Sequence, residues 1–445
     1  MAFFIFQHLF QKHAKLSGFH LIQAHEACVI AHIPAALSGN TEEFLVYRNR
    51  NAIAACPADL HRQTHALLFY LYRAVRTVRK LHIQFPAFHE LKEAVAELTD
   101  KPVKTIIFTH SHPDHRGGSG VFRDTVEEVI AFAPVNEPLK FSNTIMNGLG
   151  ARTARQFGYS LSDEELITQG LGIREDHNGS EVLPVTTLYD EDEVELTIDG
   201  RVLKLVRAPG ETDDQIFVWL QGEKALCCAD NYYACWPNLY AIRGSSYRDV
   251  AAWVDSLGKM LEYDTEYLLP GHTGAIVGAQ QVKEVLGNYR AAIESILLQT
   301  LDCIDRGLGL DDTLAAVKLP QELVDLPYLG EYYGSIDWSV RSIYQGYVGW
   351  FDGQVANLHP LSLAQRAAEL VPALGGVSKV AELVEAAQAE EKWQWALELC
   401  EMALCIEDDE AIRALKIKSL YELSKLETSA NGRHYYLVSA HEMEA

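Results

Sequence analysis

The chain has 445 residues, and 61 acidic side chains against 38 Lys and Arg give a formal net charge of −23 at pH 7. Such a charge argues against non-specific nucleic-acid binding, which needs basic groups opposite the phosphates, and it repels anionic lipid. At roughly 150 residues per domain, the length predicts two or three domains. We expect no membrane span, because no run reaches the ~20 apolar residues that one requires.

The compartment is left open by the sequence. The eight cysteines are scattered and form no CxxC pair, a pattern typical of reduced thiols that favours the cytoplasm. The apolar start of the chain lacks a basic region, so we expect no signal peptide.

The elements change character along the chain. Residues 1–88 show no clean period and form an atypical N-terminal region, whereas 89–98 space their apolar residues as a helix and 103–108 form a short buried strand. Further strands are predicted at 194–198, 202–206, 216–220, 225–229 and 267–269. Asp199-Gly200 is a hairpin signal between the first two of these.

The strands stop beyond residue 280. A long amphipathic helix is predicted from about Val282 to Ile304, with Gly307 as its stop. From about 360 nearly every segment favours helix, with stretches at 364–371, 377–389, 393–405 and 411–423. We expect a docking module of two to four helices there.

One motif carries most of the chemistry. His110, His112, Asp114 and His115 form an HxHxDH string directly after the predicted strand at 103–108. Irregular backbone beyond a strand can aim the first two side chains at one point and the last two at a neighbouring point. Imidazole nitrogen with one carboxylate suits Zn²⁺ or a similar ion.

Three more candidate ligands follow predicted strands. They are Glu211, Asp230 and His272, and each stands where a strand delivers it to one edge of a sheet. Asp230, with two oxygens, is the natural bridge between two ions. Two metals lower the pKa of a water and polarise the substrate oxygen, so the set predicts hydrolysis by a metal-activated water, with Asp114 and Asp230 as catalytic groups.

The combined motifs resemble the alkylsulfatase branch of the metallo-β-lactamase superfamily. The likeness includes the segments 208–216, 229–233, 237–244, 247–250, 338–341, 349–353 and 431–433, and it covers roughly residues 89–440. It implies an αββα sandwich of the α/β class, followed by an all-α dimerisation domain. The implied division is an atypical region at 1–88, a catalytic domain at 89–300, a connecting segment at 301–359 and a helical domain at 360–445.

The resemblance also implies an activity and a ligand set. The activity is hydrolysis of alkyl sulfates such as dodecyl sulfate, with two Zn²⁺ per chain. One zinc would be held by His110, His112 and Glu211, the other by Asp114, His115 and His272, with Asp230 bridging them. Asn238, Arg243 and Arg248 would bind the sulfate, and guanidinium groups suit such oxyanions. The implied assembly is a homodimer through the C-terminal helices.

Two features depart from the family pattern. Residues 1–88 do not resemble the strands that precede HxHxDH in relatives, and our hypothesis is that they are aberrant or form an incomplete first sheet. The sterol-carrier-like domain that full-length relatives append does not follow the helical region.

Two other readings stay open. One is another metallo-β-lactamase-fold hydrolase, acting on a thioester, lactone or phosphodiester. The other is a catalytically inactive protein that assembles through its helices. Alkyl chain length, primary against secondary sulfate, and C–O against S–O cleavage are not fixed by the sequence.

Overall fold

The fold is given by a computed structural model that describes residues 92, 95–96, 99–166, 168–172 and 181–444. The prediction for residues 1–88 falls outside this part of the chain. So does most of the predicted helix at 89–98, of which only three residues are described, all helical.

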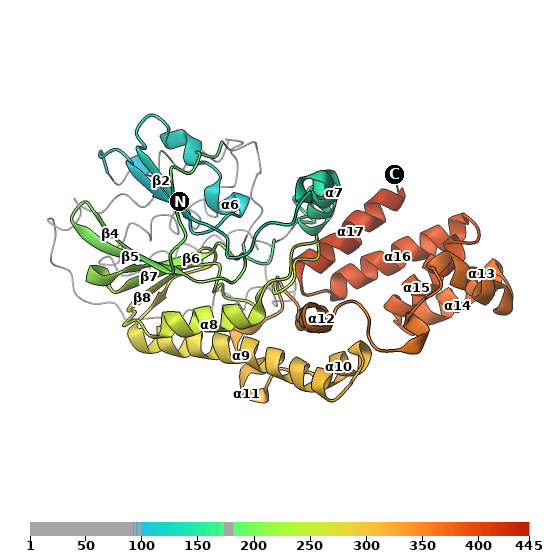
Figure 1. The fold of residues 1–445 in the computed structure, drawn as a ribbon. Helices are drawn as coiled ribbons and strands as arrows, with labels where there is room; N and C mark the ends of the chain where they lie inside the picture. The colour runs from blue at the N-terminus through green and yellow to red at the C-terminus, as the bar shows by residue number, and fades with distance from the viewer. Residues whose placement is uncertain (1–91, 93–94, 97–98, 167, 173–180, 445) are drawn as a thin grey trace, which may run out of the picture.

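Two sheets lie one above the other at the left of Figure 1. The smaller has the order β1-β2-β3, and its strands are parallel. Its strands are β1 (Thr105–Ile107), β2 (Glu128–Phe132) and β3 (Thr187–Tyr189). The predicted strand at 103–108 is confirmed as β1, while β2 and β3 were not predicted because their short runs lack a clear period.

The larger sheet has six strands in the order β4-β5-β6-β7-β8-β9. They are β4 (Glu193–Ile198), β5 (Arg201–Arg207), β6 (Ile216–Leu220), β7 (Ala225–Ala229), β8 (Tyr267–Pro270) and β9 (Ile276–Val277). All pairs are antiparallel except β7 with β8. The predicted hairpin between β4 and β5 is confirmed, and both turn residues have the positive φ that this turn requires, 50° at Asp199 and 77° at Gly200.

The two sheets share a core. Ile107 and Ile130 of the smaller sheet belong to one buried cluster with Leu205, Ile216 and Val218 of the larger one. The other face of the larger sheet is covered by α8 (Val250–Leu261) and α9 (Ala279–Asp305), as Figure 1 shows. The long helix predicted from 282 to 304 is thereby confirmed. The layers are those of the expected sandwich.

Shorter helices surround the sandwich. α6 (Pro113–Arg116) and the 3-10 turns η3 (Ser119–Phe122) and η4 (Ser142–Ile145) follow β1 and β2, and α7 (Met146–Gln156) comes next. Between the sandwich and the C-terminal helices run α10 (Leu310–Ala316), α11 (Gln321–Val324), η6 (Pro327–Leu329) and α12 (Ile336–Val348).

The C-terminal helices form a unit with its own buried cluster, which includes Val371, Val384, Leu399 and Ile412. The unit contains α13 (Leu363–Ala373), α14 (Val377–Ala389), α15 (Trp393–Leu404), α16 (Glu410–Leu426) and α17 (Ala430–Glu444). Five helices are therefore described after residue 360, so the expected module of two to four helices was too small. The missed helix is α17, which packs beside α7 of the catalytic part as well as against α16 (Figure 1). Within the described residues, no helix has the length and apolar character needed to cross a bilayer.

Candidate metal and anion site

Four segments end at one place in the sandwich. β1 is followed by the HxHxDH string, the β5–β6 connection carries Glu211, and β7 and β8 are followed by Asp230 and His272. The two sheets are joined at this edge by a hydrogen bond from the Ile216 amide to the Thr109 carbonyl, 2.9 Å long. The fold therefore delivers ligand-type side chains from both sheets to one edge.

The seven predicted ligands fall into two groups. His110, His112, Glu211 and Asp230 form the first group, and Asp114, His115 and His272 form the second; the ligand atoms within each group lie within 4.8 Å of one another. This division agrees with the two ligand sets that the sequence implied, with Asp230 assigned to the first.

Asp230 lies between the two groups. Its Oδ2 is 3.7 Å from His110 Nε2 in the first group, and it is 3.0 Å from His115 Nε2 and 3.2 Å from His272 Nε2 in the second. Asp114 Oδ2 is 3.3 Å from each of the same two imidazole nitrogens of the second group. One carboxylate thus contacts both groups.

These separations fit a metal ion. Ligand atoms at tetrahedral corners around an ion with bonds of about 2.05 Å lie about 3.3 Å apart. The Nε2 atoms of His115 and His272 face each other at 3.2 Å, where neutral rings without a shared proton or cation between them would repel. His110 Nε2 and Asp230 Oδ1 are buried without a hydrogen-bond partner. The residues therefore make a candidate site for divalent metal.

The pKa shifts of these side chains also indicate a site for a cation. Burial opposes ionisation of Asp114 and Asp230, but the neighbouring His115 holds the pKa of both carboxyls well below the usual range. Burial alone would lower the pKa of His115, yet the two carboxylates raise it to about 10. Burial, and then the charge of His115, lowers the pKa of His110. The cluster therefore keeps two carboxylates ionised, of which Asp230 is 1% exposed and Asp114 26% exposed.

Local backbone geometry aims Asp230 into the site. The pairing of β7 with β8 shifts register between Cys227 and Ala229, and such a bulge redirects the next side chain. Ala229 has a positive φ of 49°, which L-residues adopt at some cost. Asn231 holds the turn in place, because its Nδ2 donates to the Ala208 carbonyl at 2.9 Å and its own carbonyl accepts from Trp253 Nε1 at 3.0 Å.

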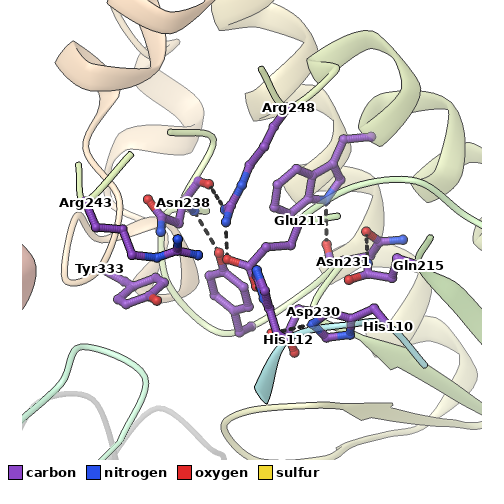
Figure 2. A network of polar contacts seen from close by, with 12 residues as sticks. His110, His112, Glu211, Gln215, Asp230, Asn231, Asn238, Arg243, Arg248 and Tyr333 are labelled. Carbon is purple, nitrogen blue, oxygen red and sulfur yellow. Dashed lines mark hydrogen bonds and ion pairs between the residues drawn. The ribbon is translucent and has the colours of Figure 1, made fainter. Parts of the chain in front are cut away.

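Arg248 lies behind the first ligand group. Its Nη1 donates to Glu211 Oε1 at 2.8 Å and also to the Asn238 carbonyl (Figure 2). The pair is buried, with both side chains 4% exposed. Arg248 therefore orients a ligand-type carboxylate, while its buried Nε has no hydrogen-bond partner among the described residues.

The other side of the site holds a guanidinium group and a phenol. Figure 2 shows Arg243, Asn238 and Tyr333 together, to one side of the metal-type ligands. Arg243 forms no ion pair with any carboxylate among the described residues, and its Nη1 donates to the neighbouring Gly244 carbonyl at 3.2 Å. Burial, and then the Glu211 carboxylate, raises the pKa of Tyr333 well above its ordinary value, so the phenol stays protonated. Neutral and cationic donors at this position suit an oxyanion.

Some of these residues were not predicted from the sequence. Tyr333 follows η6, more than 60 residues beyond the nearest predicted ligand, and no motif marks it. Gln156, which accepts a hydrogen bond from the Arg243 amide at 2.8 Å, was also missed. The segment 431–433 had been noticed only as part of the family likeness, which was the one available signal for this region.

Two family models match the chain. Residues 84–272 match the metallo-beta-lactamase superfamily, and residues 310–445 match alkyl sulfatase dimerisation. The first match covers both described sheets up to β8, and the second covers α10 to α12 and the C-terminal helices.

Individual proteins agree with the family models. A linear primary-alkylsulfatase from Pseudomonas sp. (strain ATCC 19151) is 34% identical over 78% of this chain and 68% of its own length. An alkyl/aryl-sulfatase from Saccharomyces cerevisiae is 28% identical over 77% of this chain and 55% of its own length. The solved structure of a stereoselective inverting sec-alkylsulfatase from Pseudomonas sp. has a TM-score of 0.72 and 25% identity, over 80% of this chain and 59% of that one. The chain thus spans between about half and two thirds of the length of these relatives.

Proposed function

Because this chain belongs to the alkylsulfatase family of the metallo-β-lactamase superfamily, we propose that it hydrolyses alkyl sulfate esters to an alcohol and inorganic sulfate. One structural observation supports this activity in addition to family membership. Asp230 lies between two groups of metal-type ligands, and next to them stands Arg243, which has no carboxylate partner among the described residues (Figure 2). Hydrolysis of a sulfate ester needs both of these features, a metal site that activates water and a cationic group that holds the sulfate.

We assign two Zn²⁺ to the ligand groups. His110, His112 and Glu211 would hold one ion, Asp114, His115 and His272 the other, and Asp230 would contact both. When bound, the metals would polarise the ester and lower the pKa of a water towards neutrality.

The side chains of the protein then have separate tasks. Arg243 and Asn238 would bind the sulfate oxygens, and Arg248 fixes Glu211 through Nη1. Asp230 is 1% exposed, whereas Asp114 is 26% exposed. Asp114 is therefore the carboxylate that can pass the proton of the attacking water to solvent.

We propose that the protein is a homodimer through its C-terminal helices. The match of residues 310–445 to alkyl sulfatase dimerisation supports self-association. Large apolar side chains are exposed before and within these helices, including Trp350 at 71%, Val355 at 81% and Leu370 at 46%. Light scattering on the purified chain measures its oligomeric state, and a monomer at micromolar concentration would contradict the homodimer.

The first experiment combines metal analysis with hydrolysis of dodecyl sulfate, in the presence and absence of a chelator. We expect about two zinc ions per chain and sulfate release that the chelator abolishes. Two zinc ions without sulfate release would move the assignment to another ester, such as a thioester, lactone or phosphodiester. A folded chain that binds no metal would support the inactive assembly protein instead.

The anion side of the site is tested by Arg243→Gln. We expect KM for dodecyl sulfate and the inhibition constant of inorganic sulfate to rise about tenfold to a hundredfold, because a charge-assisted hydrogen bond to the sulfate is lost. Arg341→Gln is the matched control, since Arg341 forms only an exposed pair with Asp337. Equal constants in both variants would remove Arg243 from the sulfate site.

A further inference from the structure

The first turn of α17 contacts the catalytic part of the chain directly. Ser429 Oγ donates to the Tyr333 carbonyl at 2.8 Å, and Asn431 Nδ2 donates to the same oxygen at 3.1 Å. The Ala430 amide donates to the neighbouring Tyr332 carbonyl at 2.9 Å. Ser429 and Asn431 are fully buried. Two side-chain donors on one carbonyl occupy both of its lone pairs and fix the position of residue 333.

The backbone at Tyr333 has little room to move. The Gly334 amide donates to the Trp236 carbonyl at 3.3 Å, and a Cβ at Gly334 would collide with the Pro237 carbonyl. The Tyr333 ring meets the Tyr233 ring edge to face, with centroids 5.8 Å apart. Tyr233 Oη in turn accepts from the Asn238 amide at 2.7 Å. A shift of residue 333 would therefore reach the segment that carries Asn238.

A second connection runs from α17 through α7 to Arg243. His434 Nδ1 lies 2.9 Å from the Gln156 carbonyl, and Gln156 Oε1 accepts from the Arg243 amide at 2.8 Å. Arg152 of α7 also donates to the carbonyls of Arg243 and of Ile242, the latter at 2.7 Å. The backbone of Arg243 is thus held by α7, and α7 is held by α17.

We propose that the start of α17 and the residue before it, through Ser429, Asn431 and His434, position Tyr333 and Arg243 for the anion. The helical part of the chain would then complete the sulfate site in addition to supporting assembly. The identity of the anion rests on the proposed function. Ser429, Asn431 and His434 are positioning residues, because they act through the backbone of the groups that face the anion. Small displacements of such groups are costly to binding and turnover.

The test compares Asn431→Ala with a control variant that loses a buried side-chain amide elsewhere in the helical part. Gln388 is buried, and its Nε2 donates to the Leu415 carbonyl at 2.8 Å and to Ser419 Oγ at 3.0 Å. Gln388→Ala therefore removes a buried amide whose two hydrogen bonds both go to α16 rather than to Tyr333. Asn431→Asp keeps the size of Asn431 but removes the donor.

We expect Asn431→Ala and Asn431→Asp to raise KM for dodecyl sulfate and the inhibition constant of inorganic sulfate about tenfold, with metal content unchanged. Gln388→Ala should leave both constants at the wild-type values. An unfolded fraction lowers only the apparent kcat, so a change in KM separates positioning from loss of folded protein. Constants in the Asn431 variants that equal those of Gln388→Ala would overturn the inference.

A readout that needs no turnover separates this inference from the proposed function. Hydrogen exchange of peptides covering 328–335 and 238–245 should be faster in Asn431→Ala than in the wild type, and unchanged in Gln388→Ala. If the wild type cleaves no dodecyl sulfate, the proposed function fails, while faster exchange in these two segments still supports the positioning role. Unchanged exchange in both segments would overturn it.

Discussion

His434 provides a quantitative test of how α17 is held against α7. The residue is fully buried, and its Nδ1 donates to the Gln156 carbonyl, 2.9 Å away. Burial, which outweighs that hydrogen bond, lowers the pKa of His434 from 6.5 to about 4. The perturbation is His434→Asn, which keeps a donor on the side chain and removes the titrating ring.

The sign follows from proton linkage. The pKa is lower in the folded state, so the unfolded state binds more protons between about pH 6.5 and about pH 4. The contribution to stability is therefore complete above the upper limit and is lost as the pH falls towards the lower one. At about pH 5 the unfolded ring is almost fully protonated and the folded ring almost fully neutral. The difference in unfolding free energy between about pH 7.5 and about pH 5 is then about 2 kcal/mol from this residue.

The assay is urea unfolding of the wild type and of His434→Asn at both pH values, followed by tryptophan fluorescence. Other groups also titrate in this range, so the informative quantity is the difference between the two proteins in their pH dependence. We expect the wild type to lose about 2 kcal/mol more than the variant on acidification. Parallel pH dependences would refute the argument, because they would mean that His434 titrates alike in the folded and unfolded chain.

Two further predictions concern the metal side of the site. Arg248→Met should weaken binding of one metal about tenfold to a hundredfold, because the buried Glu211 carboxylate loses its donor; zinc titration measures this, and unchanged affinity for both ions would contradict it. Gly271→Ala should abolish metal binding, since its Cβ would lie 2.7 Å from His115 Cε1, whereas Gly274→Ala meets open space and should bind metal normally. Equal zinc content in the two glycine variants would show that the Gly271 backbone can move aside.

The candidate metal cluster was predictable because it depends on short-range patterns. HxHxDH follows β1, and Glu211, Asp230 and His272 each follow a strand that its apolar residues had predicted. A strand end fixes where the next few side chains lie, so sequence reasoning could assign these residues to one edge. The long helix α9 and the hairpin at Asp199 were predictable for the same reason, since periodicity and turn chemistry are local.

The anion side was decided by tertiary packing. Arg248 was predicted to contact sulfate, and the fold turns its Nη1 onto Glu211, a partner 37 positions away in the chain. Tyr333 and Asn431 are 98 positions apart, and only the packing of α17 onto the sandwich brings them together. Side chains without a local pattern acquire a role from whichever elements pack against them. The sequence by itself therefore determined which ligand-type side chains gather at one sheet edge, whereas the three-dimensional fold decided which groups surround the candidate anion site.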